Sequence, residues 1–200
     1  MKKYEGKKLY SIAESYIITY NLFRSVPKFI SGRKNDLLSK QLVERIMLAV
    51  TEVNGCDICS YAHAKMALES GMTEDEIKNM LAGIQDDVPG EEMPAVMFAQ
   101  HYADFRGRPS KESWDRLVEI YDLPKAQGII GAIRMIMWGN AYGIAWSSFI
   151  GRFKRKANSR SNLFYELLMM TTTMLYFPFA FIHALVASLF KVSLIKFNKQ

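Results

Sequence analysis

Apolar residues recur at three- and four-residue spacing from one end of the chain to the other, and this helical periodicity restricts the fold more than any other feature. In the segment 40–53, this spacing marks one buried helix face, formed by Leu42, Ile46, Val50 and Val53. No segment shows sustained period-two alternation between hairpin turns, which is the pattern typical of strands. We therefore expect an all-α fold, a bundle of about seven or eight helices.

Turn and capping residues indicate where the helices begin and end. Asn54 and Gly55 interrupt the first apolar pattern, because both tolerate the positive φ of a tight turn. Thr73 and Glu76 have the spacing of a capping box, in which each side chain bonds the backbone N–H of the other residue. The sequence thus predicts helices over 40–53, 56–70, 74–82, 94–105, 111–121 and 125–149.

The last of these predicted helices contains Gly128, Gly131, Gly139 and Gly143. A glycine in an exposed helix interior costs about 1 kcal/mol relative to alanine, so some other interaction must compensate. We expect that compensation to be close packing between helices. A single histidine on another helix, His101, is also interpreted as structural.

Charge and cysteine content limit the classes of function. The formal charge of +6 does not indicate a nucleic-acid partner, because the basic residues are scattered and gather only in 152–160 and at the C-terminus.

The first twenty residues lack the apolar core of a secretory signal, so we expect a cytoplasmic protein. Only two cysteines occur, Cys56 and Cys59, and in a reducing compartment such a pair predicts catalysis or metal binding.

Cys56, Cys59 and His63 are spaced to lie along one stripe of a helix. Both cysteines would fall in its first turn, where free backbone N–H groups and the helix dipole favour a thiolate. His63 could accept the thiol proton and return it later. Glu44 lies on the preceding helix, which the Asn-Gly turn would fold back, so its carboxylate could orient His63.

Two other interpretations of these residues stay open at this point. Free cysteines are often ordinary core residues, although a pair at a helix start followed by a histidine is an unusual packing pattern. Two thiols, an imidazole and a carboxylate are also an acceptable zinc-ligand set. Structural zinc usually joins separated elements, however, whereas three of these ligands would lie along one short helix.

The pattern of Glu44, eleven residues, Cys56, two residues, Cys59, three residues and His63 resembles the signature of alkylhydroperoxidase D-like proteins in the carboxymuconolactone decarboxylase family. The run CDICSYAHAKMALESGMTEDEI also resembles the sequence around that signature. The resemblance is close over about 36–84 and loose over about 10–150.

This resemblance implies a thiol-dependent peroxidase or disulfide oxidoreductase, an antioxidant enzyme that reduces hydroperoxides. It implies that Cys59 becomes a sulfenic acid and that Cys56 donates a proton and then closes a Cys56–Cys59 disulfide. His63 and Glu44 would complete the proton relay. No bound cofactor is implied, and a lipoyl-type dithiol or another thiol reductant protein would reopen the disulfide. The family fold is all-helical and assembles into dimers, trimers or hexamers.

One position departs from the family pattern. Some members carry a histidine immediately before the second cysteine, whereas this chain has Ile58, so any proton transfer assigned to that position is lost. The decarboxylase branch of the family works without the cysteine pair. The presence of Cys56 and Cys59 therefore argues against lactone decarboxylation.

The C-terminal part of the chain is unusually apolar. Residues 167–190 contain no Asp, Glu, Lys or Arg, and about 20 apolar residues suffice to cross a bilayer. Pro178, His183 and basic flanks on both sides fit equally a pair of apolar helices buried in an oligomer. We expect a catalytic domain over 1–160 and a hydrophobic extension over 161–200 that contacts a membrane or another subunit. A non-enzymatic, membrane-tethered helical oligomer is the alternative.

Overall fold

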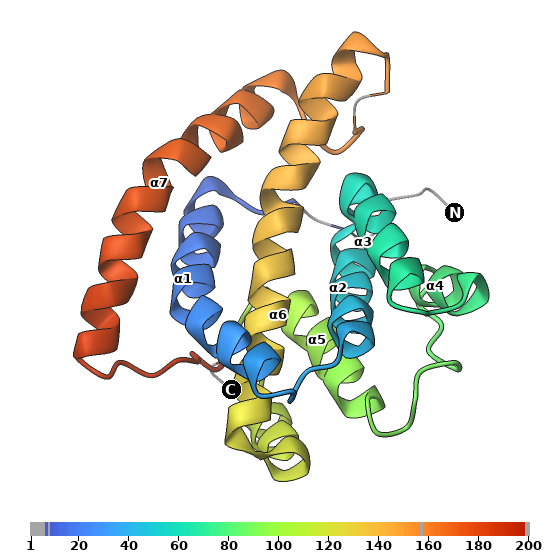
Figure 1. The fold of residues 1–200 in the computed structure, drawn as a ribbon. Coiled ribbons are helices and arrows are strands. Elements are labelled where there is room, and N and C mark those ends of the chain that lie inside the picture. Colours follow the sequence, from blue (N-terminus) through green and yellow to red (C-terminus); the bar gives the residue numbers. More distant parts are fainter. Residues whose placement is uncertain (1–6, 8, 157, 199–200) are drawn as a thin grey trace.

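A computed structural model describes residues 7, 9–156 and 158–198, and the described part of the chain is helical with no strand (Figure 1). The predicted all-α fold is confirmed. The helices are α1 (Ile12–Lys34), α2 (Lys40–Asn54), α3 (Asp57–Glu69), α4 (Glu74–Leu81), α5 (Met93–Asp104), α6 (Lys111–Phe153) and α7 (Leu163–Leu189).

The long helix α6 runs through the middle of the bundle (Figure 1). Helices α1, α2 and α5 pack directly against it, α7 packs against both α1 and α6, and α3 and α4 lie at the opposite edge against α2. The core consists of the apolar faces that the periodicity marked, with Leu42 and Ile46 from α2 meeting Ile129 and Ile133 from α6. All four side chains are almost completely buried.

Helix α6 bends at the boundary that the sequence indicated between 111–121 and 125–149. Asp122 has a φ of 62° and a ψ of 158°, which interrupts the helical backbone. Pro124 follows two residues later, and proline removes a backbone donor and disfavours helical conformation before it. The two predicted helices are therefore present as two arms of one bent element.

The turns between α2, α3 and α4 follow the local sequence, with one correction. Gly55 ends α2 in the left-handed conformation, with a φ of 66°. Thr73 caps α4, because its hydroxyl accepts a hydrogen bond of 3.2 Å from the backbone N–H of Glu76. The predicted reciprocal bond of the capping box is wrong, since the Glu76 carboxylate instead accepts a hydrogen bond of 2.6 Å from Arg45 Nε on α2.

Two of the α6 glycines allow close helix packing, as expected. A Cβ atom at Gly131 would lie 2.8 Å from the Cβ of Phe29 on α1. One at Gly128 would lie 3.6 Å from the Cα of Gly32 and 3.0 Å from a methyl carbon of Leu38. These positions bring the backbones of α1 and α6 together.

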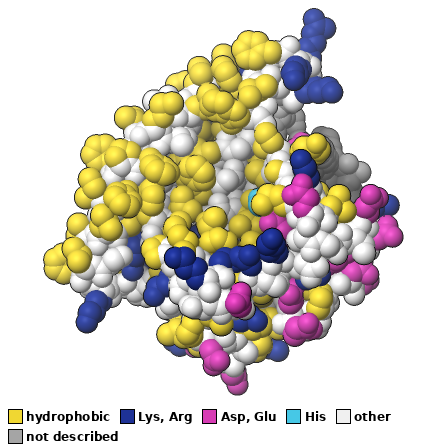
Figure 2. Space-filling model, viewed as in Figure 1, with side chains coloured by type: hydrophobic (Ala, Val, Ile, Leu, Met, Phe, Trp, Pro, Cys, Tyr) yellow, Lys and Arg dark blue, Asp and Glu magenta, His cyan; other side chains and the backbone are white. Residues whose placement is uncertain are grey.

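Helix α7 is long enough and apolar enough to cross a membrane, judged by length and composition alone. Its inner side packs on the bundle through Ala180, Ala184 and Ala187, but only 22% of its most apolar window is buried. Large apolar side chains of α7, including Met174 and Phe179, are exposed. Figure 2 shows a broad apolar face on the side of the molecule where α7 lies. The predictions of membrane contact and of subunit contact both stay predictions.

Candidate active site

The two cysteines lie at the start of α3 and are joined in a disulfide. Cys56 is the N-cap residue, Cys59 lies in the first turn, and their Cα atoms are 5.3 Å apart. Gly55 reverses the chain immediately before them. The cysteines thus occupy the helix end whose unpaired N–H groups and dipole stabilise a thiolate once the disulfide is reduced.

A carboxylate and an imidazole pair next to this disulfide. His63 Nδ1 donates a hydrogen bond of 2.8 Å to Glu44 Oε2, and both side chains are mostly buried. His63 lies one helical turn after Cys59, and Glu44 comes from α2, which the turn at Gly55 places alongside α3. The bond to Glu44 fixes the tautomer in which Nε2 carries the lone pair, so Nε2 is the ring nitrogen that can take up a proton.

The backbone of α6 covers the disulfide at two glycines. A Cβ atom at Gly143 would lie 3.1 Å from Cys59 Sγ and 3.3 Å from Cys56 Sγ. The carbonyl oxygen of Gly139, one turn earlier, lies 3.7 Å from Cys59 Sγ. The packing interpretation of these glycines is therefore incomplete, because Gly143 makes room for the sulfur atoms. Their four-residue spacing was the only sequence signal, and it does not say which partner they face.

Arg160 is a second residue of the site that the sequence did not indicate. Its guanidinium donates hydrogen bonds of 3.0 Å to the carbonyl oxygen of Asn54 and 2.6 Å to that of Gly55. The sequence placed Arg160 only in a basic cluster that precedes the apolar C-terminal segment. In the structure it holds the turn that leads into Cys56 and brings a positive charge close to the first cysteine, which favours a thiolate there.

Access to the disulfide is narrow and unequal at the two sulfurs. Cys56 is fully buried, whereas Cys59 is 8% exposed. The main pockets of the described part of the chain have neither cysteine in their walls. Exposed apolar side chains of Ile58 and Tyr61 lie on α3 beside the cysteines, so the approach to Cys59 runs over an apolar surface.

The remaining candidates outside the site have structural partners. His101 Nε2 accepts a hydrogen bond of 3.1 Å from the backbone N–H of Ser110, and its ring packs at a tilt against that of Phe105, with 4.4 Å between the ring centroids. Within the described residues, no group of three or more His, Cys, Asp or Glu side chains is placed to hold a metal ion.

Comparison with known proteins bears on the same segment. A sequence model described as the carboxymuconolactone decarboxylase family matches residues 22–102. The matched segment runs from α1 into α5 and contains Glu44, Cys56, Cys59 and His63. No curated protein and no solved structure matches the chain.

Proposed function

We propose, from the match of residues 22–102 to the carboxymuconolactone decarboxylase family model and from the geometry of the site, that this chain is a thiol-dependent peroxidase and disulfide oxidoreductase of the alkylhydroperoxidase-like kind. One observation carries the proposal. The α2–α3 hairpin that holds the Cys56–Cys59 disulfide also holds the Glu44–His63 pair, with 2.8 Å between carboxylate and imidazole. A redox disulfide beside an oriented acid-base pair can perform both the sulfur chemistry and the proton transfer that it requires.

The first half of the proposed cycle starts from the reduced cysteines. His63 Nε2 takes the thiol proton of Cys59, and Glu44 stabilises the resulting imidazolium. The Cys59 thiolate attacks the outer oxygen of a hydroperoxide ROOH, so that an S–O bond forms and the O–O bond breaks. The proton held by His63 goes to the leaving alkoxide. The products are the alcohol ROH and a sulfenic acid at Cys59.

The second half forms and then reopens the disulfide. The Cys56 sulfur attacks Cys59, its proton leaves with the hydroxyl as water, and the S–S bond closes. An external dithiol, such as a lipoyl group, then attacks Cys59 Sγ, the more exposed of the two sulfurs, and Cys56 leaves as a thiolate. The second thiol of the reductant releases Cys59. In balance, ROOH and a dithiol give ROH, water and the oxidised reductant.

Cysteine variants test the proposal directly. Cys59→Ser is expected to abolish turnover of an organic hydroperoxide with dihydrolipoamide, and Cys56→Ser to stop after about one equivalent of peroxide, because the sulfenic acid cannot be resolved. Glu69→Gln is the control, since its carboxylate lies on the exposed side of α3, 3.9 Å from Lys65. Unchanged turnover in both cysteine variants would refute the proposal.

The acid-base pair has its own test. His63→Asn and Glu44→Gln should each lower the rate by about 10²- to 10⁴-fold and change its pH profile, as expected for positioned proton-transfer groups. Zinc analysis of the purified protein tests the alternative. Stoichiometric zinc together with cysteines that do not react with a thiol reagent would end the redox proposal.

The reductant partner can be captured at Cys59. In Cys56→Ser protein a reductant protein left with a single reactive thiol should stay attached to oxidised Cys59 as a mixed disulfide, because neither partner then has a second thiol that could break it. The exposed Ile58 and Tyr61 side chains provide an apolar contact surface for such a partner. Replacing Tyr61, which is 76% exposed, by Ser should weaken this capture while leaving the reaction with small dithiols unchanged.

A further inference from the structure

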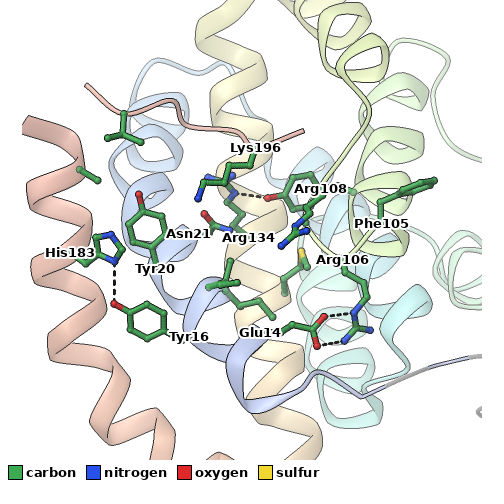
Figure 3. A pocket seen from close by; sticks show the side chains of 17 residues that line it. Glu14, Tyr16, Tyr20, Asn21, Phe105, Arg106, Arg108, Arg134, His183 and Lys196 are labelled. Atoms are coloured by element: carbon green, nitrogen blue, oxygen red, sulfur yellow. Dashed lines mark hydrogen bonds and ion pairs between the residues drawn. The ribbon is translucent and has the colours of Figure 1, made fainter. Parts of the chain in front are cut away.

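A pocket of about 530 Å³ lies between α1, α7 and the loop that joins α5 to α6. Figure 3 shows its walls, with Tyr16 and Tyr20 of α1 beside His183 of α7 on one side and Arg106 and Arg108 of the loop on the other. Small-molecule sites usually enclose ~300–1,000 Å³, so its size suits an organic ligand. The pocket does not contain the cysteines and is separate from the candidate active site.

The charges around this pocket are strongly unequal. Four cationic side chains line it, namely Arg106, Arg108, Arg134 and Lys196, against the single carboxylate of Glu14. That carboxylate is already bound, because Arg106 Nη2 donates a hydrogen bond of 2.7 Å to it. Three cations therefore face the pocket without a carboxylate partner among the described residues.

Arg134 is the most informative of these cations. It is only 2% exposed, and its guanidinium donates hydrogen bonds of 2.8 Å to three neutral acceptors: the hydroxyls of Tyr102 and Ser25 and the carbonyl oxygen of Leu194. A buried charge is costly unless an opposite charge compensates it. In Figure 3, Arg134 lies between Asn21 and the two outer cations, Arg108 and Lys196.

The rest of the pocket wall is apolar or aromatic. Ile17, Ile18 and Met137 line it together with the rings of Tyr16 and Tyr20, and α7 contributes His183 and the buried Ala187. A ligand can therefore place an anionic group at the cations and an apolar body against these side chains.

We propose that this pocket binds an amphipathic organic anion, with a carboxylate or phosphate-monoester head group at Arg108, Arg134 and Lys196 and a hydrocarbon body between α1 and α7. Bidentate, charge-assisted hydrogen bonding suits guanidinium groups to either head group. The ligand supplies the negative charge that the three neutral hydrogen-bond acceptors of Arg134 do not provide.

Calorimetric titration of the full-length protein with decanoate tests the proposal, with decyl phosphate and decanol as companion ligands. We expect decanoate or decyl phosphate to bind saturably at one site per chain, and decanol, which has no charge, to bind at least about tenfold more weakly. The tighter of the two anions identifies the head group. Higher salt should weaken anion binding, since Arg108 and Lys196 lie at the exposed rim.

The double substitution Arg108→Gln/Lys196→Gln should weaken anion binding at least about tenfold without unfolding the protein, because both side chains are exposed. Arg116→Gln/Lys78→Gln removes the same charge away from the pocket and should bind like the unmodified protein. Three results would overturn the proposal: no saturable binding of either anion, equal binding of decanol, or equal binding by the pocket and control variants.

Discussion

Replacing Gly143 by alanine probes the contact between α6 and the disulfide. The added Cβ would lie 3.1 Å from Cys59 Sγ and 3.3 Å from Cys56 Sγ. Favourable contacts between carbon atoms lie at ~3.5–4.0 Å, and sulfur is the larger atom, so the helix or the disulfide must move. Overpacking of this kind costs about 1–3 kcal/mol. Removing a glycine from a helix interior returns about 1 kcal/mol, so a net loss of about 0–2 kcal/mol is expected.

Gly139→Ala is a matched control on the same helix. Its added Cβ would have Ile136 Cδ1 as nearest neighbour at 3.9 Å, an ordinary contact. Gly139→Ala should therefore show the helix-propensity gain without the clash. The two variants should differ by about 1–3 kcal/mol in the free energy of unfolding, a difference from which the propensity term cancels.

Denaturant unfolding of the oxidised proteins measures this difference. A third comparison isolates the contribution of the contact with the sulfur atoms. In a Cys56→Ala/Cys59→Ala background the added methyl group has room, so Gly143→Ala should become stabilising by up to about 1 kcal/mol. If Gly143→Ala is as stable as Gly139→Ala in the oxidised protein, the inferred contact between α6 and the disulfide is wrong.

Three further predictions follow from contacts outside that helix face. A hydrogen bond from Arg106 lowers the pKa of Glu14 to about 2, so this pair should stabilise the fold above about pH 4.5 and lose that contribution as the pH falls towards 2. The contribution is ~1 kcal/mol or less, because solvent screens the pair. The stability of Glu14→Gln should therefore not show this loss between about pH 4.5 and about pH 2 in acid unfolding. Arg160→Met should raise the pKa of the reduced Cys56 thiol, seen as slower alkylation near neutral pH, and an unchanged pH profile would contradict the role given to Arg160. The exposed face of α7 should be covered in the cell, so fractionation without detergent should give either a membrane-bound protein or a discrete oligomer, and a soluble monomer would exclude both.

Local sequence signals predicted the helical fold and the spacing of the candidate site residues. Spacing alone placed Cys56, Cys59 and His63 along one stripe, and the turn at Gly55 brought Glu44 within 2.8 Å of His63. These relations depend on neighbours within one hairpin, for which helix geometry is sufficient. Their catalytic roles stay predictions.

The sequence did not predict the contacts between residues far apart in the chain. Gly143 lies more than eighty residues from the cysteines that it covers, and Arg160 more than a hundred residues from the turn that it holds. Glu76 illustrates the same limit, because a distant Arg45 competes successfully with the nearby backbone for its carboxylate. Which partner wins such a competition depends on how helices pack, and periodicity does not contain that information.

The uninterrupted arm of α6 after Asp122 connects three parts of the molecule. Arg134 lines the cationic pocket, Gly143 covers the disulfide, and Arg152 binds the buried Glu166 at the base of α7 with an N–O distance of 2.6 Å. At 1.5 Å per residue, the two arginines stand ~27 Å apart on one rigid rod. A movement of this helix along its axis that uncovers the sulfur atoms would also displace both guanidinium groups. A ligand bound in the pocket, or a partner bound to α7, would therefore oppose that movement.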